Sequence, residues 1–99
     1  MATYYLAVDM GASSGRLMLG HLDNGRMKLE EVHRFENGMV KKDGELCWEF
    51  DRIFKEIITG LKKCKAMNKI PVSMGVDTWG VDFVLLDKNG DVIGNTVGY

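Results

Sequence analysis

Cysteine is scarce in this chain, and its two occurrences fit neither a disulfide framework nor a structural zinc site. Cys47 and Cys64 stand far apart, and neither has a second cysteine or a histidine near it at zinc-ligand spacing. Proline occurs once, and no apolar run approaches the roughly 18 residues that a membrane-spanning helix needs. We therefore expect reduced thiols and no membrane as partner.

The chain also lacks an excess of charge of either sign. Thirteen basic and fourteen acidic side chains give a formal net charge of −1, so electrostatics gives no reason to expect a nucleic acid or an anionic membrane as partner. Residues 1–3 lead directly into an apolar segment, without the basic region of a signal peptide. These features predict a cytoplasmic protein. With 99 residues, 45% of them hydrophobic, the chain makes at most one small globular domain over residues 1–99.

Apolar runs and turn residues predict a mixed α/β fold. Residues 4–8, 17–22 and 27–35 predict three antiparallel strands, the last two joined by an Asn-Gly turn. A helix is predicted where apolar residues recur at i, i+3 and i+4 spacing, at Phe50, Ile53, Phe54, Ile57, Ile58, Leu61 and Cys64. Further short strands are predicted at residues 39–40, 46–48, 72–76 and 84–86. One helix on a six-element sheet would leave the other face bare, which predicts self-association of this chain.

The segment Asp-Met-Gly-Ala-Ser-Ser-Gly-Arg, residues 9–16, directly follows the first apolar run. A carboxylate such as Asp9 can hold Mg²⁺ through water, and glycines let backbone N–H groups approach an anion closely. The glycines and hydroxyls available for this are Gly11, Ser13, Ser14 and Gly15. The segment matches neither a Walker loop nor a dinucleotide fingerprint. It suits a metal-bound phosphate, and an ordinary hairpin turn is the alternative interpretation.

A second polar cluster, residues 77–83, follows the strand predicted at 72–76. Its carboxylates, Asp77 and Asp82, can accept hydrogen bonds from sugar hydroxyls, and the Trp79 indole can pack on the C–H face of a sugar. The alternative is a loop that caps the sheet, in which the carboxylates bond backbone groups and the indole fills a gap in the core.

The two clusters together resemble a known arrangement. A three-strand antiparallel meander carrying Asp-x-Gly, a crossover helix and further strands in a mixed sheet resemble the N-terminal subdomain of the ribonuclease H-like, actin-like ATPase fold. Within that fold the chain resembles the FGGY family of carbohydrate kinases along nearly its whole length. The resemblance is carried by residues 7–16, 33–38 and 75–87. The family more often has threonine or serine where Ala12 stands.

The resemblance implies ATP-dependent phosphorylation of L-rhamnulose, with Mg²⁺ organised by Asp9. The residues it implies for ATP binding are Gly11, Ala12, Ser13, Ser14, Gly15 and Arg16. Gly80 would contact the ketose, with Trp79 and Asp82 at the pocket wall and Asp77 as a weaker candidate. The Arg16 guanidinium would offset charge on the phosphates, or would instead pair with a carboxylate on the sheet.

In this family the aspartate that deprotonates the sugar hydroxyl lies farther along the chain, as does the adenosine pocket. We therefore expect the catalytic base beyond residue 99, and expect the chain to be the N-terminal piece of a kinase that is nearly inactive alone. Two alternatives stay open, a non-catalytic nucleotide-binding or interaction module of the same fold and a kinase of this family for another ketose. The cluster at residues 77–83 favours a kinase, because a nucleotide switch does not need an indole and a carboxylate facing a small pocket.

Overall fold

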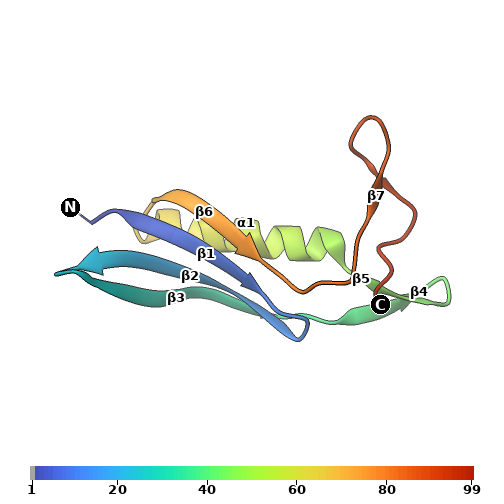
Figure 1. The fold of residues 1–99 in the computed structure, drawn as a ribbon, viewed down its shortest axis with the longest axis horizontal. Coiled ribbons are helices and arrows are strands. Elements are labelled where there is room, and N and C mark those ends of the chain that lie inside the picture. Colours follow the sequence, from blue (N-terminus) through green and yellow to red (C-terminus); the bar gives the residue numbers. More distant parts are fainter. Residues whose placement is uncertain (1) are drawn as a thin grey trace.

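The computed structural model describes residues 2–99, and its central element is a four-stranded mixed sheet. The elements follow in the order β1 (Tyr4–Met10), β2 (Ser14–Asp23), β3 (Arg26–Glu36), β4 (Met39–Lys42), β5 (Glu45–Trp48), α1 (Phe50–Ala66), β6 (Pro71–Asp77), β7 (Leu85–Leu86) and β8 (Val92–Ile93). The strand order is β3-β2-β1-β6, with β6 parallel to β1 and the other neighbours antiparallel (Figure 1). The predicted meander, crossover helix and following strand are confirmed.

The turn between β2 and β3 fixes the register of the meander. Asn24 and Gly25 both have positive φ, 52° and 77°, as a two-residue type I′ turn requires. This turn sets the pairing of β2 with β3 and directs Leu17 and Leu19 toward the core, where they are buried. A slip of one residue would turn both side chains to the opposite face.

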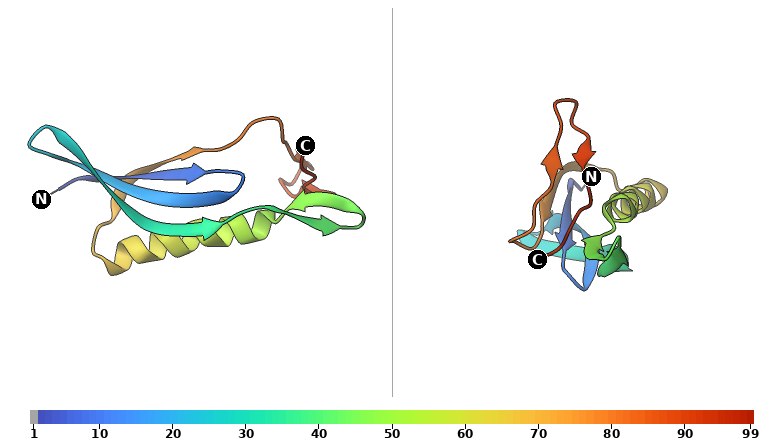
Figure 2. Two further views of the ribbon diagram at one scale, coloured as in Figure 1. Left: turned by 90° about the horizontal axis from the view of Figure 1, so that it is seen from below. Right: turned by 90° about the vertical axis from the view of Figure 1, so that its right-hand side faces the viewer.

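The helix α1 lies along one face of the sheet (Figure 1, Figure 2). Its partly buried Ile53, Ile57 and Leu61 pack against the buried cluster, as the apolar periodicity predicts. Gly60 lies where the helix approaches β2, because a Cβ at this position would meet the side chain of Leu17. Within residues 2–99 no helix is long and apolar enough to cross a membrane.

The prediction of a six-element sheet is wrong, because the short strands form two separate hairpins. β4 pairs with β5, and β7 pairs with β8. The Asp43-Gly44 turn, with φ of 54° and 80°, satisfies the first hairpin locally, so its strands need no place in the main sheet. Val97 adds an isolated bridge to Cys47 of β5. This bridge brings the C-terminal residues beside the β4-β5 hairpin, as Figure 2 shows.

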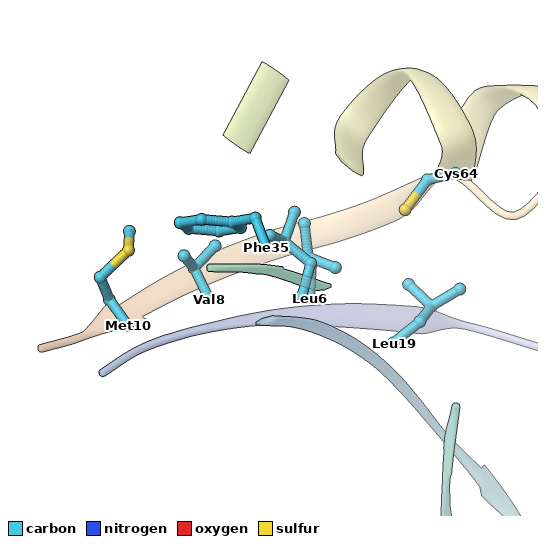
Figure 3. Close-up of a cluster of buried hydrophobic side chains, with 7 residues drawn as sticks. Leu6, Val8, Met10, Leu19, Phe35 and Cys64 are labelled. Atoms are coloured by element: carbon cyan, nitrogen blue, oxygen red, sulfur yellow. The ribbon is translucent and has the colours of Figure 1, made fainter. Parts of the chain in front are cut away.

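The core is small and lies between the sheet and α1 (Figure 3). Its buried residues are Leu6, Val8, Met10, Leu17, Leu19, Phe35 and Cys64. Cys47 and Cys64 are both free and buried. Burial raises the pKa of the Cys64 thiol, partly against a backbone hydrogen bond that lowers it. A buried thiol with a raised pKa is an unreactive structural group.

Candidate functional site

The first polar cluster forms a turn tighter than the sequence indicates. Ser14, Gly15 and Arg16 already belong to β2, so only residues 11–13 lie between the strands. The Gly11 N–H donates to the Ser14 carbonyl oxygen at 2.9 Å. Asn37, which follows β3, clamps the turn from outside: its backbone N–H donates to Ser13 O at 2.9 Å and its side-chain amide to Gly11 O at 3.0 Å.

Gly11 of this turn and Gly15, which follows it in β2, are both required by close approach. A Cβ on Gly11 would come within 2.7 Å of the Ser14 carbonyl oxygen, which is backbone and cannot move aside. A Cβ on Gly15 would enter the ring of Phe35, which is buried in the core. The turn therefore has a rigid backbone whose shape is set from both sides.

Asp9 lies at the centre of the charged groups beside this turn. On one side it stands opposite Arg16 in the antiparallel register, and on the other it is level with Asp77 on β6. Arg16 Nε donates to Asp9 Oδ2 at 3.0 Å, and both side chains are about half exposed. The pairing of Arg16 with a carboxylate on the sheet, one of the two alternatives, is thus present in this structure.

The donor set around Asp9 suits Mg²⁺ better than a metal held by protein alone. Within residues 2–99 no group of three His, Cys, Asp or Glu side chains converges on one point. Mg²⁺ usually keeps several waters and binds through one or two carboxylates together with substrate phosphates. Asp9, a half-exposed carboxylate at the end of β1 next to the turn, fits that mode of binding.

One residue of the first polar cluster lines a hollow together with residues of the second. Ala12 of the turn, Trp79 and Gly80 of the loop after β6, and Asp82 all line an open hollow of about 360 Å³. Its other lining residues are Met39, Trp48, Val81 and Tyr99. Asp77 does not line it. The structure therefore brings Ala12 together with three of the four candidate sugar residues. The other candidates for metal and phosphate binding do not line this hollow: Asp9, Gly11, Ser13, Ser14, Gly15 and Arg16.

Asp82 is occupied by hydrogen bonds to protein. Its Oδ2 accepts from Trp48 Nε1 and from Trp79 Nε1, both at 2.7 Å, and its Oδ1 accepts from the Tyr99 backbone N–H at 2.7 Å. Partial burial of the carboxylate works to raise its pKa, but the three donors outweigh this and hold the pKa of Asp82 below its ordinary value.

Trp48 is a member of this site that the sequence analysis missed. Its ring lies against that of Trp79, with centroids 4.3 Å apart and planes inclined by 40°. No pattern in the sequence near residue 48 points to the site, because its partner carboxylate is 34 positions away. Only the position of an aromatic residue at the end of a predicted short strand gave a signal.

Gly80 differs from the glycines of the turn. A Cβ built on it would have no protein atom within 4 Å, and its φ is not in the left-handed region. Nothing in the described protein therefore requires a glycine here. Gly80 is one of the residues that line the hollow.

Comparison with solved structures shows the fold to which this architecture corresponds. The fold matches gluconate kinase from Lactobacillus acidophilus with a TM-score of 0.72 at 15% identity, covering 98% of this chain and 20% of that one. It also matches the PPX-GPPA enzyme of Aquifex aeolicus with a TM-score of 0.53 at 16% identity, covering 79% of this chain and 27% of that one. The chain has the actin-like ATPase fold, as the sequence predicts.

Sequence comparison identifies more similar relatives than the structural comparison does. The chain is 54% identical to the rhamnulokinase of Halalkalibacterium halodurans over 97% of its own length. It is 50% identical to that of Oceanobacillus iheyensis over 95% and 44% identical to that of Bacillus subtilis over 96%. The chain spans about a fifth of the length of these curated relatives, with 20% covered in each. No protein-family model matches it. The resemblance to sugar kinases is confirmed, and these relatives are rhamnulokinases.

Proposed function

We propose that this chain supplies the phosphate turn and part of the ketose site of an ATP-dependent kinase that acts on L-rhamnulose. The observation that carries the proposal is that Ala12, Trp79 and Gly80 line one hollow. Phosphoryl transfer needs the donor phosphate and the acceptor hydroxyl held together. The similarity to rhamnulokinases supports L-rhamnulose as the acceptor and L-rhamnulose 1-phosphate as the product.

In this proposal the turn binds the phosphates of ATP. The Gly11 N–H is already bonded to Ser14 O, so the backbone donors offered to phosphate are those of Ala12 and Ser13. The hydroxyls of Ser13 and Ser14 add further donors. Gly11 and Gly15 contribute by keeping the turn narrow, so that the phosphates can approach its backbone.

In this proposal Asp9 and Arg16 help to neutralise the negative charge of the ATP phosphates, Asp9 by holding Mg²⁺ and Arg16 directly. Asp9 would hold Mg²⁺ through water, and the bound ion neutralises charge on the phosphates. The Arg16 side chain is 45% exposed, so its guanidinium has room to turn from Asp9 toward the phosphates when the carboxylate faces the cation. Asp77, level with Asp9 on β6, is a second carboxylate beside this position.

The general base and the adenosine pocket are proposed to lie outside residues 1–99. The isolated chain would then bind substrates weakly and transfer phosphate very slowly, because catalysis needs the base, the metal and both substrates placed together. A cytoplasmic location is part of the proposal, since ATP and sugar phosphates are cytoplasmic metabolites.

The proposal is tested by measuring ADP release from MgATP by the intact protein that carries this segment, against a panel of ketoses. L-Rhamnulose should give the highest kcat/KM, and ADP release without sugar should be at least about a hundredfold slower. Preference for another ketose would support the proposed kinase activity and reject L-rhamnulose as its substrate. Nucleotide binding without any sugar-dependent ADP release would reject the kinase in favour of a non-catalytic module.

A further inference from the structure

We propose that Asp82 is a positioning residue, and that Trp48 and Trp79 together form the aromatic wall of the ketose site. The inference rests on the proposed function and deepens it. It changes the role expected for Asp82, from a group that binds sugar to one that acts through two indoles. It also adds Trp48, which has had no role at the site, as a residue that contacts the sugar.

Hydrogen bonds from the protein engage both carboxylate oxygens of Asp82. Both indole N–H groups point at the same oxygen, Oδ2, at 2.7 Å, and the Tyr99 N–H occupies Oδ1. Donors therefore already engage both oxygens of this carboxylate. Short bonds to an ionised acceptor are strong and directional, so Asp82 fixes the orientation of both rings.

The two rings come from different parts of the fold. Trp48 ends β5 in the small hairpin, whereas Trp79 belongs to the loop that leaves β6 of the main sheet. These parts of the fold share no strand pairing. The shared carboxylate and the ring contact at 4.3 Å are what join the two indoles into one surface.

Further contacts hold the two tryptophans in place. Trp79 packs against the buried cluster of the core. Gly98 lies beside Trp48, because a Cβ on Gly98 would come within 3.0 Å of Trp48 Nε1 and would also meet the Met39 side chain. The Thr96 hydroxyl and carbonyl oxygen both bond the backbone of Trp48. Trp48 and Trp79 are thus each held by packing or by backbone hydrogen bonds in addition to Asp82.

The position of the wall gives its proposed ligand. Both indoles line the same hollow as Ala12 and Gly80, so a ketose placed for phosphate transfer lies against them. Aromatic faces bind the apolar C–H faces of sugars, and rings held in place before binding lose little freedom when the sugar arrives. Loosening the rings should therefore weaken sugar binding and leave nucleotide binding unchanged.

A double-mutant cycle in the intact kinase separates positioning from direct contact. Asp82→Ala is made in the native background and again in a Trp48→Phe/Trp79→Phe background, which keeps the rings and removes their N–H groups. We expect Asp82→Ala to raise the KM for L-rhamnulose about tenfold in the native background and less than about twofold in the double-Phe background. The KM for MgATP should change by less than about twofold throughout.

The matched control is Asp87→Ala. Asp87 also accepts two backbone N–H groups, from Asn89 and Asp91, but it lies in the β7-β8 turn outside the hollow. Its loss should leave both KM values unchanged. Trp48→Ala, which removes the ring as well, should raise the sugar KM more than Trp48→Phe does. Thermal unfolding of each variant checks that it is folded.

The outcomes are distinct. An equal rise in sugar KM for Asp82→Ala in both backgrounds would mean that the carboxylate contacts sugar directly, and the positioning role would be rejected. If the kinase is active and its KM for L-rhamnulose is unchanged in all of these variants, the wall lies outside the sugar site. A native protein without ketose kinase activity would instead reject the proposed function, and the wall with it.

Discussion

At Gly80, an added methyl group should affect sugar binding without affecting stability. A methyl group there would meet no protein atom within 4 Å, so Gly80→Ala should leave the unfolding temperature unchanged while the methyl group obstructs the hollow. We expect the KM for L-rhamnulose to rise about tenfold in the intact kinase, measured by coupled ADP release. Gly38→Ala is the matched control, because a Cβ on Gly38 also meets open space but lies outside the hollow. Equal effects of the two substitutions would contradict a ligand contact at Gly80.

The hydrogen bonds of Asp82 should make the arrangement of the two indoles depend on pH. Its folded pKa lies below the ordinary 3.8, so the stability it contributes is fully present above that value and is lost as the pH falls through the folded pKa. The near-ultraviolet circular dichroism difference between the native protein and the Trp48→Phe variant reports the coupled indoles. We expect this difference to be constant from pH 7 to about 4 and to disappear only at lower pH. A midpoint above the ordinary aspartate pKa would contradict the three-donor arrangement.

At the scale of elements, the contact between α1 and β2 reverses the usual effect of a glycine in a helix. Replacing Gly60 by alanine gains about 1 kcal/mol of helix propensity. The added methyl group would meet the Leu17 side chain, which is fully buried, and such overpacking typically costs about 1–3 kcal/mol. We expect Gly60→Ala to lower the denaturation midpoint. Thr59→Ala, at an exposed neighbouring site, should change stability by less than about 0.5 kcal/mol.

A second substitution tests the cause of that loss. Leu17→Val removes bulk from the position that the new methyl group would occupy. Combined with Gly60→Ala, it should cost less than the sum of the two single changes, because neighbours in one packing contact are not additive. Additive losses would mean that the helix is destabilised for another reason.

The elements also separate what local sequence determines from what it does not. The Asn24-Gly25 turn and the apolar stripe of α1 are local signals, and both predicted their structures correctly. The turn after β1 was predicted at the right place but too long. Gly15 and Arg16 pair with both β1 and β3, and Ser14 already pairs with β3. The six-element sheet failed for the opposite reason, since the short strands pair with each other more readily than with a distant sheet edge.

The arrangement around Asp82 shows the same limit at the candidate site. Trp79 and Asp82 are three positions apart in one polar cluster, and the family resemblance implied that both lie at a pocket wall. Trp48 and Tyr99 reach the same carboxylate from 34 and 17 positions away. Contacts of this kind depend on how the hairpin and the C-terminal residues fold back together, and no local periodicity encodes them.

For the molecule as a whole, elongated shape and bare apolar surface predict self-association of the isolated chain. Its radius of gyration is 15.8 Å, whereas a compact chain of this length has about 13 Å. The edge strand β6 exposes Val72, Met74 and Val76 at 69%, 48% and 57%, and the last two share a face with the buried Leu6 and Val8. An uncovered apolar edge of this kind readily pairs with another chain.

Sedimentation velocity of the 99-residue chain tests this expectation. Dimers or larger species should increase with concentration. Val76→Lys, which places a charge on the exposed edge, should shift the distribution toward monomer. A native chain that sediments as a monomer and unfolds cooperatively would show that this surface does not need a partner.

The measurement that tests the central claim most directly follows phosphate transfer to L-rhamnulose by ³¹P nuclear magnetic resonance. The intact protein is compared with its Asp9→Ala variant and with the isolated chain, each supplied with MgATP. The account predicts L-rhamnulose 1-phosphate from the intact protein, a rate at least about a hundredfold lower in the variant, and almost no product from the isolated chain. Full activity without the Asp9 carboxylate, or no sugar phosphate from the intact protein, would contradict it.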